Sequence, residues 1–137
     1  MIKLVTGIYT RFTELTGELH NSFYIAVGGR LYRELAQQGV TLPYSVYHVI
    51  DSVPDFTFST TLENTRIQFD LISDDEDDVE IEDLYTKLTA LYDWATITVS
   101  GSQFLYMKRE NVRLTREAES GWWVYNIDYS CLMETSG

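Results

Sequence analysis

Cysteine, proline and positive charge are scarce in this chain of 137 residues. The one cysteine, Cys131, cannot form a disulfide within the chain, which fits a reducing compartment and excludes a disulfide-stapled fold. The 10 lysines and arginines stand against 21 aspartates and glutamates, so the formal net charge is −11. A surface of this sign repels phosphate, which argues against a protein that grips DNA but not against one that DNA passes.

Long hydrophobic runs are also missing. No stretch approaches the roughly 20 consecutive apolar residues that span a bilayer, and Arg11 and Glu14 interrupt the apolar pattern at the amino terminus before a signal-peptide core forms. We therefore expect no membrane insertion and no export. Because 45% of the residues are hydrophobic, the chain can bury a core, and we predict one domain over residues 1–134 followed by a flexible tail, 135–137.

Sequence motifs for catalysis are absent as well. His20 and His48 are far apart and lack accompanying ligands, and neither a glycine-rich phosphate loop nor a Gly-x-Ser-x-Gly elbow occurs. Cys131 falls on the apolar side of an alternating segment, as expected of a buried thiol. The sequence predicts no catalytic residue, no metal site and no cofactor, and hence a protein that is not an enzyme.

Two segments show the period of amphipathic helices. In the first, the apolar residues at helical spacing are Val5, Ile8, Phe12, Leu15 and Leu19. The second begins where Asp77 precedes Glu80 at capping-box spacing, and the carboxylates there favour the positive end of a helix dipole. Its apolar stripe consists of Ile81, Leu84, Tyr85, Leu88, Leu91 and Tyr92.

Strand patterns fill most of the remaining chain. Residues 65–72 alternate cleanly, residues 44–50 are apolar on both faces, and residues 96–99 are typical of a short strand. Segments 104–115 and 123–131, on either side of a glycine turn, form a predicted hairpin. The order of helix, strands, helix and strands predicts an α+β fold, a mainly antiparallel β-sheet with two principal helices packed against it.

Three short segments carry a family resemblance. The first, Gly28-Gly29-Arg30-Leu31-Tyr32, turns sharply and leads into Gln38-Gly39-Val40-Thr41-Leu42-Pro43-Tyr44, in which Pro43 suits the start of a strand. The third is Arg66-Ile67-Gln68-Phe69-Asp70-Leu71. With these segments the chain resembles the tail-completion or tail-terminator proteins of bacteriophages with long non-contractile tails, from about the first helix to the strand at Tyr129.

This resemblance implies a structural virion protein with a tail-terminator-like fold. It would form a ring, expected to be a hexamer, that ends the tail tube and joins the tail to the head connector or stopper protein at the tail–neck junction. Copies would assemble in the host cytoplasm, and DNA would pass through the lumen without specific binding. The alternatives are a neighbouring neck protein (a stopper or adaptor), a metal-dependent hydrolase using Asp70 and the carboxylates after it, and a small-molecule binding module with an aromatic pocket.

The most unusual composition is an acidic run of five residues: Asp74, Asp75, Glu76, Asp77 and Asp78. A solvated loop and helix cap accounts for it, and the lack of a glycine between Asp70 and Glu82 excludes an EF-hand. Repeated around a ring, the same carboxylates would instead make an acidic lumen or docking rim to which DNA does not adhere.

Aromatic residues and one arginine supply further candidate contacts. Because aromatic side chains are favoured at protein interfaces, we expect Tyr32 and Tyr47 at the subunit interface. Arg30 is a further candidate there, since it would cross to an acidic group on the next subunit. For Arg30, a bond to a nearby backbone carbonyl is the favoured local role. A loop over residues 54–61, which carries Phe56 and Phe58, would order on docking to a partner protein.

Overall fold

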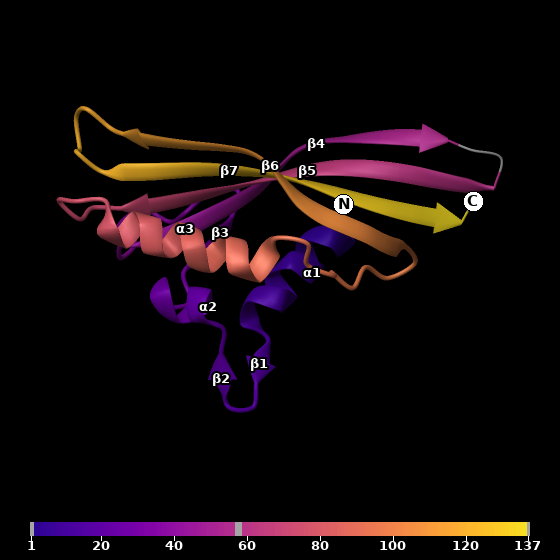
Figure 1. The fold of residues 1–137 in the computed structure, drawn as a ribbon, viewed down its shortest axis with the longest axis horizontal. Coiled ribbons are helices and arrows are strands. Elements are labelled where there is room, and N and C mark those ends of the chain that lie inside the picture. The colour runs from indigo at the N-terminus through magenta and orange to yellow at the C-terminus, as the bar shows by residue number, and fades with distance from the viewer. Residues whose placement is uncertain (1, 57–58, 137) are drawn as a thin grey trace.

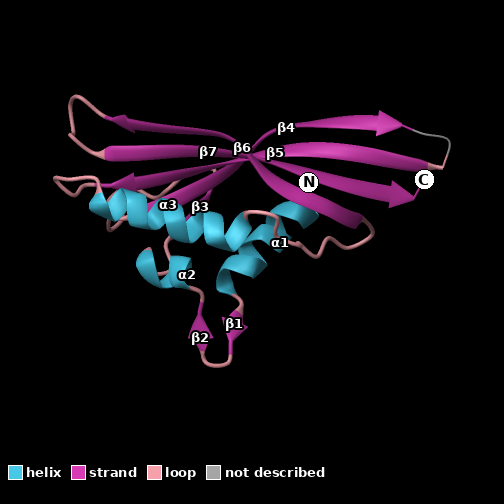
Figure 2. Ribbon diagram, viewed as in Figure 1, coloured by secondary structure: helices cyan, strands magenta, loops and turns pink. Residues whose placement is uncertain are grey.

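The computed structural model describes residues 2–56 and 59–136. Within them, helices cover one side of a long twisted sheet and leave its other side bare (Figure 1, Figure 2). The helices are α1 (Ile2–Thr13), α2 (Ser22–Ala26) and α3 (Val79–Tyr92). The strands of the sheet are β3 (Leu31–Arg33), β4 (Tyr44–Phe56), β5 (Thr60–Ser73), β6 (Gln103–Arg116) and β7 (Trp123–Ser136), and β1 (Leu15–Thr16) and β2 (Leu19–His20) form a separate hairpin.

The five strands of the sheet lie in the order β3-β4-β5-β7-β6. β3 runs parallel to β4, whereas all the other neighbours are antiparallel. The α+β fold predicted from the sequence, a mainly antiparallel sheet with helices on one face, is therefore confirmed. The predicted hairpin is also confirmed, since β6 pairs with β7 along its length.

Alternation along β5 and β7 places their apolar side chains against the helices. Ile67, Phe69 and Leu71 of β5 are fully buried, as are Ile127 and Tyr129 of β7. The helices fill the same core with Leu4, Val5, Ile8 and Phe12 from α1 and Ile81, Leu84, Leu88 and Tyr92 from α3. Both periodicities in the sequence therefore report burial of apolar surface, the main favourable term of folding.

Tyr92 joins the helical layer to the sheet. Its ring centroid lies 4.7 Å from that of Phe69 and 6.5 Å from that of Tyr129. The Tyr92 hydroxyl donates to the carbonyl oxygen of Ile8 at 2.8 Å, and the Tyr129 hydroxyl donates to Oδ1 of Asp93 at 2.6 Å. Burial raises the pKa of Tyr92 well above its ordinary value, and burial followed by the Asp93 bond does the same for the pKa of Tyr129. Both phenols therefore remain protonated donors.

The first helix is shorter than its apolar period predicts. α1 ends at Thr13, and Leu15 and Leu19 belong to the β1–β2 hairpin, where they are 54% and 69% exposed. The chain reverses between them at Gly17, whose φ of +67° favours glycine. The prediction that the helix stripe continues to Leu19 is therefore wrong, because a turn brings these leucines to the same spacing without a helix.

The side chain of Asn21 explains where the first two helices stop and start. Its Nδ2 donates to the Phe12 carbonyl oxygen near the end of α1 at 2.8 Å. Its Oδ1 accepts from the backbone N–H of Tyr24 at 2.8 Å and so caps the start of α2. One asparagine thus satisfies backbone groups at two helix ends.

The strand predicted at residues 96–99 does not form. Ile97 and Val99 are buried and alternate with exposed neighbours, but the segment is absent from the described sheet and Ile97 contacts α1. A Cβ built at Gly7 of α1 would lie 2.5 Å from Cγ2 of Ile97 and 2.8 Å from the carbonyl oxygen of Thr98. Alternating burial here comes from packing on a helix and not from strand pairing.

The loop predicted over residues 54–61 is mostly strand. β4 continues through Pro54 to Phe56, which pairs with Thr61 of β5. Pro54 is tolerated because this half of β4 lies at the edge of the sheet, where a missing N–H breaks no ladder bond. Phe58, the other aromatic residue of the predicted loop, lies outside the described residues.

The carboxyl end of the chain also takes part in the sheet. Thr135 pairs with Thr61, and Ser136 pairs with Thr60. The hydroxyl of Thr135 lies 2.8 Å from that of Ser102. Residues 135 and 136 of the expected tail are thus the last residues of β7, and Gly137 lies outside the described residues.

Replacing Gly7 by alanine tests the contact between α1 and the segment around Ile97. Alanine favours a helix by about 1 kcal/mol over glycine. The new Cβ would overlap a backbone oxygen, so we expect a net loss of about 1–3 kcal/mol in the free energy of unfolding. Urea unfolding measures it, and Thr6→Ala, at an exposed neighbouring position, is the control. A stabilised Gly7→Ala protein would contradict the close packing.

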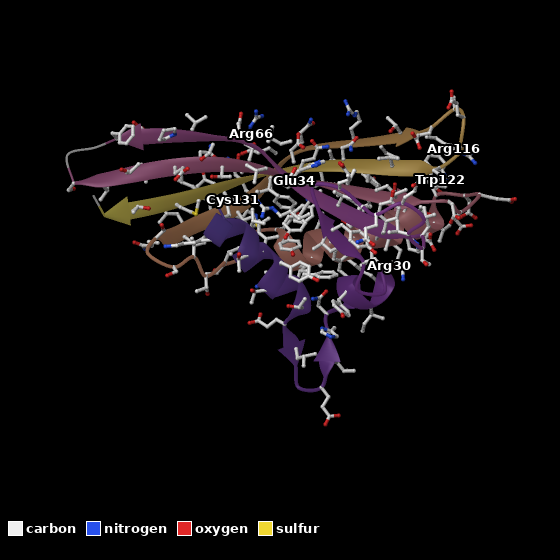
Figure 3. The ribbon with its side chains drawn as sticks, turned by 180° about the vertical axis from the view of Figure 1, so that it is seen from behind. Arg30, Glu34, Arg66, Arg116, Trp122 and Cys131 are labelled. Atoms are coloured by element: carbon white, nitrogen blue, oxygen red, sulfur yellow. The ribbon has the colours of Figure 1, made fainter. Side chains whose placement is uncertain are left out.

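The reactivity of the Cys131 thiol, on β7 of the sheet, tests whether the core is closed to solvent (Figure 3). It is fully buried, and burial raises the pKa of its thiol to about 12. The unfolded thiol ionises at about pH 8.5, so the stability that this group contributes is complete below that pH and falls as the pH rises above it. We expect no reaction of the native protein with a thiol reagent at about pH 8 and full reaction in denaturant. Stoichiometric labelling of the folded chain would show an open core.

Candidate functional site

No described helix covers the second face of the sheet (Figure 2). Polar side chains of β4, β5 and β7 meet near the centre of the sheet. Asp70 of β5 accepts at Oδ1 from Nδ2 of Asn126 at 2.6 Å and from Nε2 of Gln68 at 2.8 Å. Its Oδ2 lies 3.0 Å from Nε2 of His48. Neighbouring side chains of the same sheet therefore occupy both carboxylate oxygens, and Asp70 serves to hold the sheet.

The acidic run forms a loop between β5 and α3 at one end of the sheet (Figure 1). Its five exposed residues are Asp74, Asp75, Glu76, Asp77 and Asp78. Arg116 ties this loop to the β6–β7 turn, since it donates to the carbonyl oxygens of Glu76 at 3.2 Å and Gly121 at 3.0 Å (Figure 3). The turn adds the exposed Glu117 and Glu119. We refer to these seven carboxylate residues together as the acidic end.

The capping box predicted from Asp77 and Glu80 does not form. Asp78 occupies the N-cap position of α3 and makes no side-chain capping bond. Oδ1 of Asp77 accepts from the N–H of Val79 at 3.2 Å, and Glu80 accepts instead from the hydroxyl of Ser73 at 2.7 Å. The prediction is wrong by one residue, although Glu80 still lies in the first turn, where the helix dipole favours negative charge.

Two tyrosines near this end of the sheet have raised pKa values, chiefly because they are buried. The hydroxyl of Tyr125 donates to Oε1 of Glu82 at 2.9 Å. Burial, and then the bond to Glu82 and its negative charge, raises the pKa of Tyr125 to about 12. Burial, followed by the charge of Glu117, raises the pKa of Tyr44. Nearby carboxylates thus add to the effect of burial in keeping both phenols protonated.

Arg30 is fixed inside its own chain (Figure 3). Its Nε donates to the carbonyl oxygen of Pro43 at 2.9 Å, which links the double-glycine turn to the start of β4. The turn needs glycine at position 28, because Gly28 has a φ of +60° and its Cβ would lie 2.5 Å from Nη1 of Arg30. The local role that the sequence favoured for Arg30 is therefore confirmed.

The two tyrosines predicted at the subunit interface occupy different environments. Tyr32 is half-buried on β3, the edge strand, and its ring centroid lies 6.2 Å from that of Tyr44. Tyr47 is only 3% exposed and packs on Phe69 in the core. Because Tyr47 pairs with Phe69 across β4 and β5, its side chain faces the helices. Tyr47 is thus a core residue of this fold, and Tyr32 remains available at the edge.

Two aromatic side chains are strongly exposed. Phe56, at the end of β4, is 74% exposed, and Val53 on the same strand is 60% exposed. Trp94, 69% exposed, follows α3 with a φ of +57°, a conformation that bulky residues rarely adopt. The backbone N–H of Trp94 donates to the carbonyl oxygen of Met107 on β6 at 2.7 Å. Nothing in the sequence marks Trp94 as a surface residue, because a lone tryptophan after a helix carries no signal of its exposure.

A groove of about 360 Å³ lies between α1 and the segment that follows α3. Its lining includes Lys3, Arg11 and the hydroxyl groups of Thr6, Thr10, Thr96 and Thr98. Nε of Arg11 already donates to the carbonyl oxygen of Leu91 at 2.8 Å. The described lining residues include no aromatic side chain, so this groove is not the aromatic pocket of the small-molecule alternative.

The described residues contain no group of three or more His, Cys, Asp or Glu side chains placed to hold a metal ion. In the same part of the chain, no helix is long and apolar enough to cross a membrane. The features that the structure does present are an acidic end, a polar sheet face and two sheet edges.

The model of one protein family, described as tail completion protein gp17, matches residues 20–134. The chain belongs to this family. The resemblance drawn from the double-glycine and Leu-Pro-Tyr segments is thereby confirmed, and the chain is a structural tail protein of a bacteriophage-type virion. No curated protein matches the sequence.

The fold of this family member also recurs in a solved structure, described as "Virion of native gene transfer agent (GTA) particle". One chain of that particle superposes with a TM-score of 0.82, over 96% of this chain and 94% of that chain, with 10% identical residues. At this identity the likeness concerns the fold alone. The same arrangement of strands and helices is thus built from largely different residues.

Replacing Arg30 by glutamine tests its local role in the family member. The bond from Nε to the Pro43 carbonyl is lost, and we expect a loss of about 1–3 kcal/mol in the free energy of unfolding, as for a hydrogen bond from a charged group. Urea unfolding measures stability, and analytical ultracentrifugation measures self-association, which we expect to be unchanged. Arg33→Gln, exposed nearby, is the control and should be neutral within about 0.5 kcal/mol. Lost assembly at unchanged stability would assign Arg30 to a contact between copies.

Proposed function

We propose that this chain terminates the tail tube of a phage-like particle and joins the tail to the head. Copies form a ring, expected to be a hexamer, with one face on the last ring of tail-tube protein and the other on the connector or stopper protein. DNA passes through the lumen of the ring. Membership of the tail completion family over residues 20–134 carries this proposal. We propose further that the ring assembles in the host cytoplasm and is located at the tail–neck junction of the finished virion.

The acidic end suits a surface along which DNA passes without binding. Its carboxylates are exposed, and the raised pKa values of Tyr44 and Tyr125 are partly due to carboxylates at this end of the sheet. Lysine or arginine at the same place would release counterions from DNA and hold the duplex. Repeated by the symmetry of a ring, the acidic end forms the rim of the lumen or the face that docks a basic surface of a neighbouring virion protein.

The proposed function requires contacts between protein surfaces and no chemical reaction. Tyr32 on the β3 edge and Phe56 at the end of β4 are the aromatic residues that we assign to protein contacts. Asp70, which the hydrolase alternative would require, is engaged by three side chains of its own sheet. The proposed protein therefore acts by complementary surfaces and is not an enzyme.

Charge reversal in the acidic loop tests its role. Asp74→Lys combined with Asp75→Lys should leave the free energy of unfolding within about 0.5 kcal/mol per substitution of the original, because both side chains are exposed. We expect the variant to form rings but to join tails to heads poorly. Native mass spectrometry measures the rings, and counts of joined particles in electron micrographs measure joining.

The control is Glu14→Lys combined with Glu18→Lys, which changes the net charge equally at two exposed positions away from the acidic end. This control should join heads and tails normally. Normal joining by the acidic-loop variant would refute the role of the loop, whereas an original chain that stays monomeric and ignores tail-tube protein would refute the proposed function itself. Binding of the connector without binding of the tail tube would favour a neighbouring neck protein.

A further inference from the structure

Two long strand segments, one in β4 and one in β6, have no strand partner on their outer side in the described part of the chain. β3 covers the first part of β4, pairing with Ser45 to Tyr47, and the rest of β4, residues 49–56, borders only β5 among the described strands. On the other edge, the backbone N–H of Trp94 donates to the carbonyl oxygen of Met107 in the first part of β6. Residues 109–116 of β6 border only β7 among the described strands. Open strand edges present unpaired backbone groups that another strand can approach. We call these segments the β4 open half and the β6 open half.

The direction of the strands allows these two halves to meet between copies. From β4 through β5 and β7 to β6, each neighbour is antiparallel to the one before, so β6 runs opposite to β4. Because β4 and β6 lie towards opposite edges of the sheet, a copy related by rotation about a ring axis presents its β4 edge to the β6 edge of the first copy. The two strands are then antiparallel, and the contact is head-to-tail, the kind that closes into a ring.

The two halves carry opposite charge. The β6 open half contains Arg109, Arg113 and Arg116 with one acidic residue, Glu110. The β4 open half contains Asp51 and Asp55 and no basic residue. Charges of opposite sign across an interface fix the partner and the register.

Not all of these charges are free within one copy. Arg109 pairs with Asp93, and Asp51 pairs with Arg66. Arg113 is exposed and makes one 3.3 Å bond, to Asn126. The carboxylate of Asp55 is exposed and makes no ion pair with another described residue. Arg113 and Asp55 are therefore the charges best able to engage a second copy.

Apolar side chains accompany the charges on both edges. On the β4 open half, Ile50, Val53 and Phe56 are 45%, 60% and 74% exposed. On the β6 open half, Val112 is 36% exposed. A contact between the two halves would remove this apolar surface from water, which is the favourable term of association. The charges then select the partner, and the apolar groups stabilise the contact.

We propose that the chain assembles by placing the β6 open half of one copy against the β4 open half of a second copy, with Arg113 facing the Asp51–Asp55 segment. This inference rests on the proposed function and names the surface that closes its ring. The competing contact, β6 against β3, would bring Arg113 towards the exposed Arg33. Like charges disfavour that contact. The two open halves lie at opposite ends of the sheet, so neighbouring copies are displaced along their strands and the strands tilt, as in closed barrels.

Main-chain pairing is only part of this contact. Pro54 offers no N–H in the middle of the β4 open half, and bulges interrupt β4 between Val49 and Asp51 and β6 between Arg109 and Asn111. Side chains therefore carry much of the recognition. This makes the inference testable by charge exchange.

The experiment compares Arg113→Glu, Asp55→Arg and the double exchange with the original full-length chain. Each single reversal should raise the concentration at which half of the chains are assembled, on the order of 100-fold, and the double exchange should restore much of the assembly. Native mass spectrometry over a protein concentration series measures assembly, and circular dichroism confirms that each variant is folded. Arg33→Glu is the matched control and should assemble like the original.

The outcomes separate the two proposals. An original chain that never assembles, alone or with tail-tube protein, refutes the proposed function and the edge contact with it. An original chain that forms rings, while Arg113→Glu forms them equally well, overturns the edge contact and leaves the ring intact. Weakening by Arg33→Glu, with no effect of Arg113→Glu, assigns the contact to β3 and also overturns the inference.

Discussion

The buried hydroxyl of Tyr92 sets the arrangement of this protein. A phenol removed from water needs an acceptor, and here that acceptor is the carbonyl oxygen of Ile8, so α1 has to cross the end of α3. The Tyr92 ring packs on Phe69 of β5, which ties the same two helices to the sheet. The close approach at Gly7 and the groove beside it both follow from this position of α1.

Much of the fold was predictable because burial leaves a periodic trace. β5 and β7 each have one face in the core, and α3 buries one stripe, so period 2 and period 3.6 appear in their sequences. The errors arise where other constraints produce the same spacing. Leu15 and Leu19 keep a helical interval across a turn, and residues 96–99 alternate because they pack against a helix. Pro54 lies in a strand because an edge position does not need its N–H.

The candidate site was predictable in composition and less so in geometry. The exposure of residues 74–78 follows from their charge. The hydrogen bond from Arg116 to the carbonyl oxygen of Glu76 joins residues 40 positions apart, and no local sequence pattern predicts such a contact. For Tyr47 the composition was misleading. Its aromatic side chain suggested a subunit interface, but the register of β4 places it in the core. The solved structure with the same fold and 10% identical residues shows that this fold can be built from largely different side chains.

Pro54 affects the tendency of the free chain to aggregate through the edge of β4. A long edge strand with exposed valine and phenylalanine is a template for indefinite growth into fibrils. Pro54, near the end of this strand, interrupts the row of amides on which such growth depends, and the bulge between Val49 and Asp51 bends the strand. Pro54 therefore disfavours open-ended strand pairing at this edge, while side-chain contacts with a partner surface stay possible.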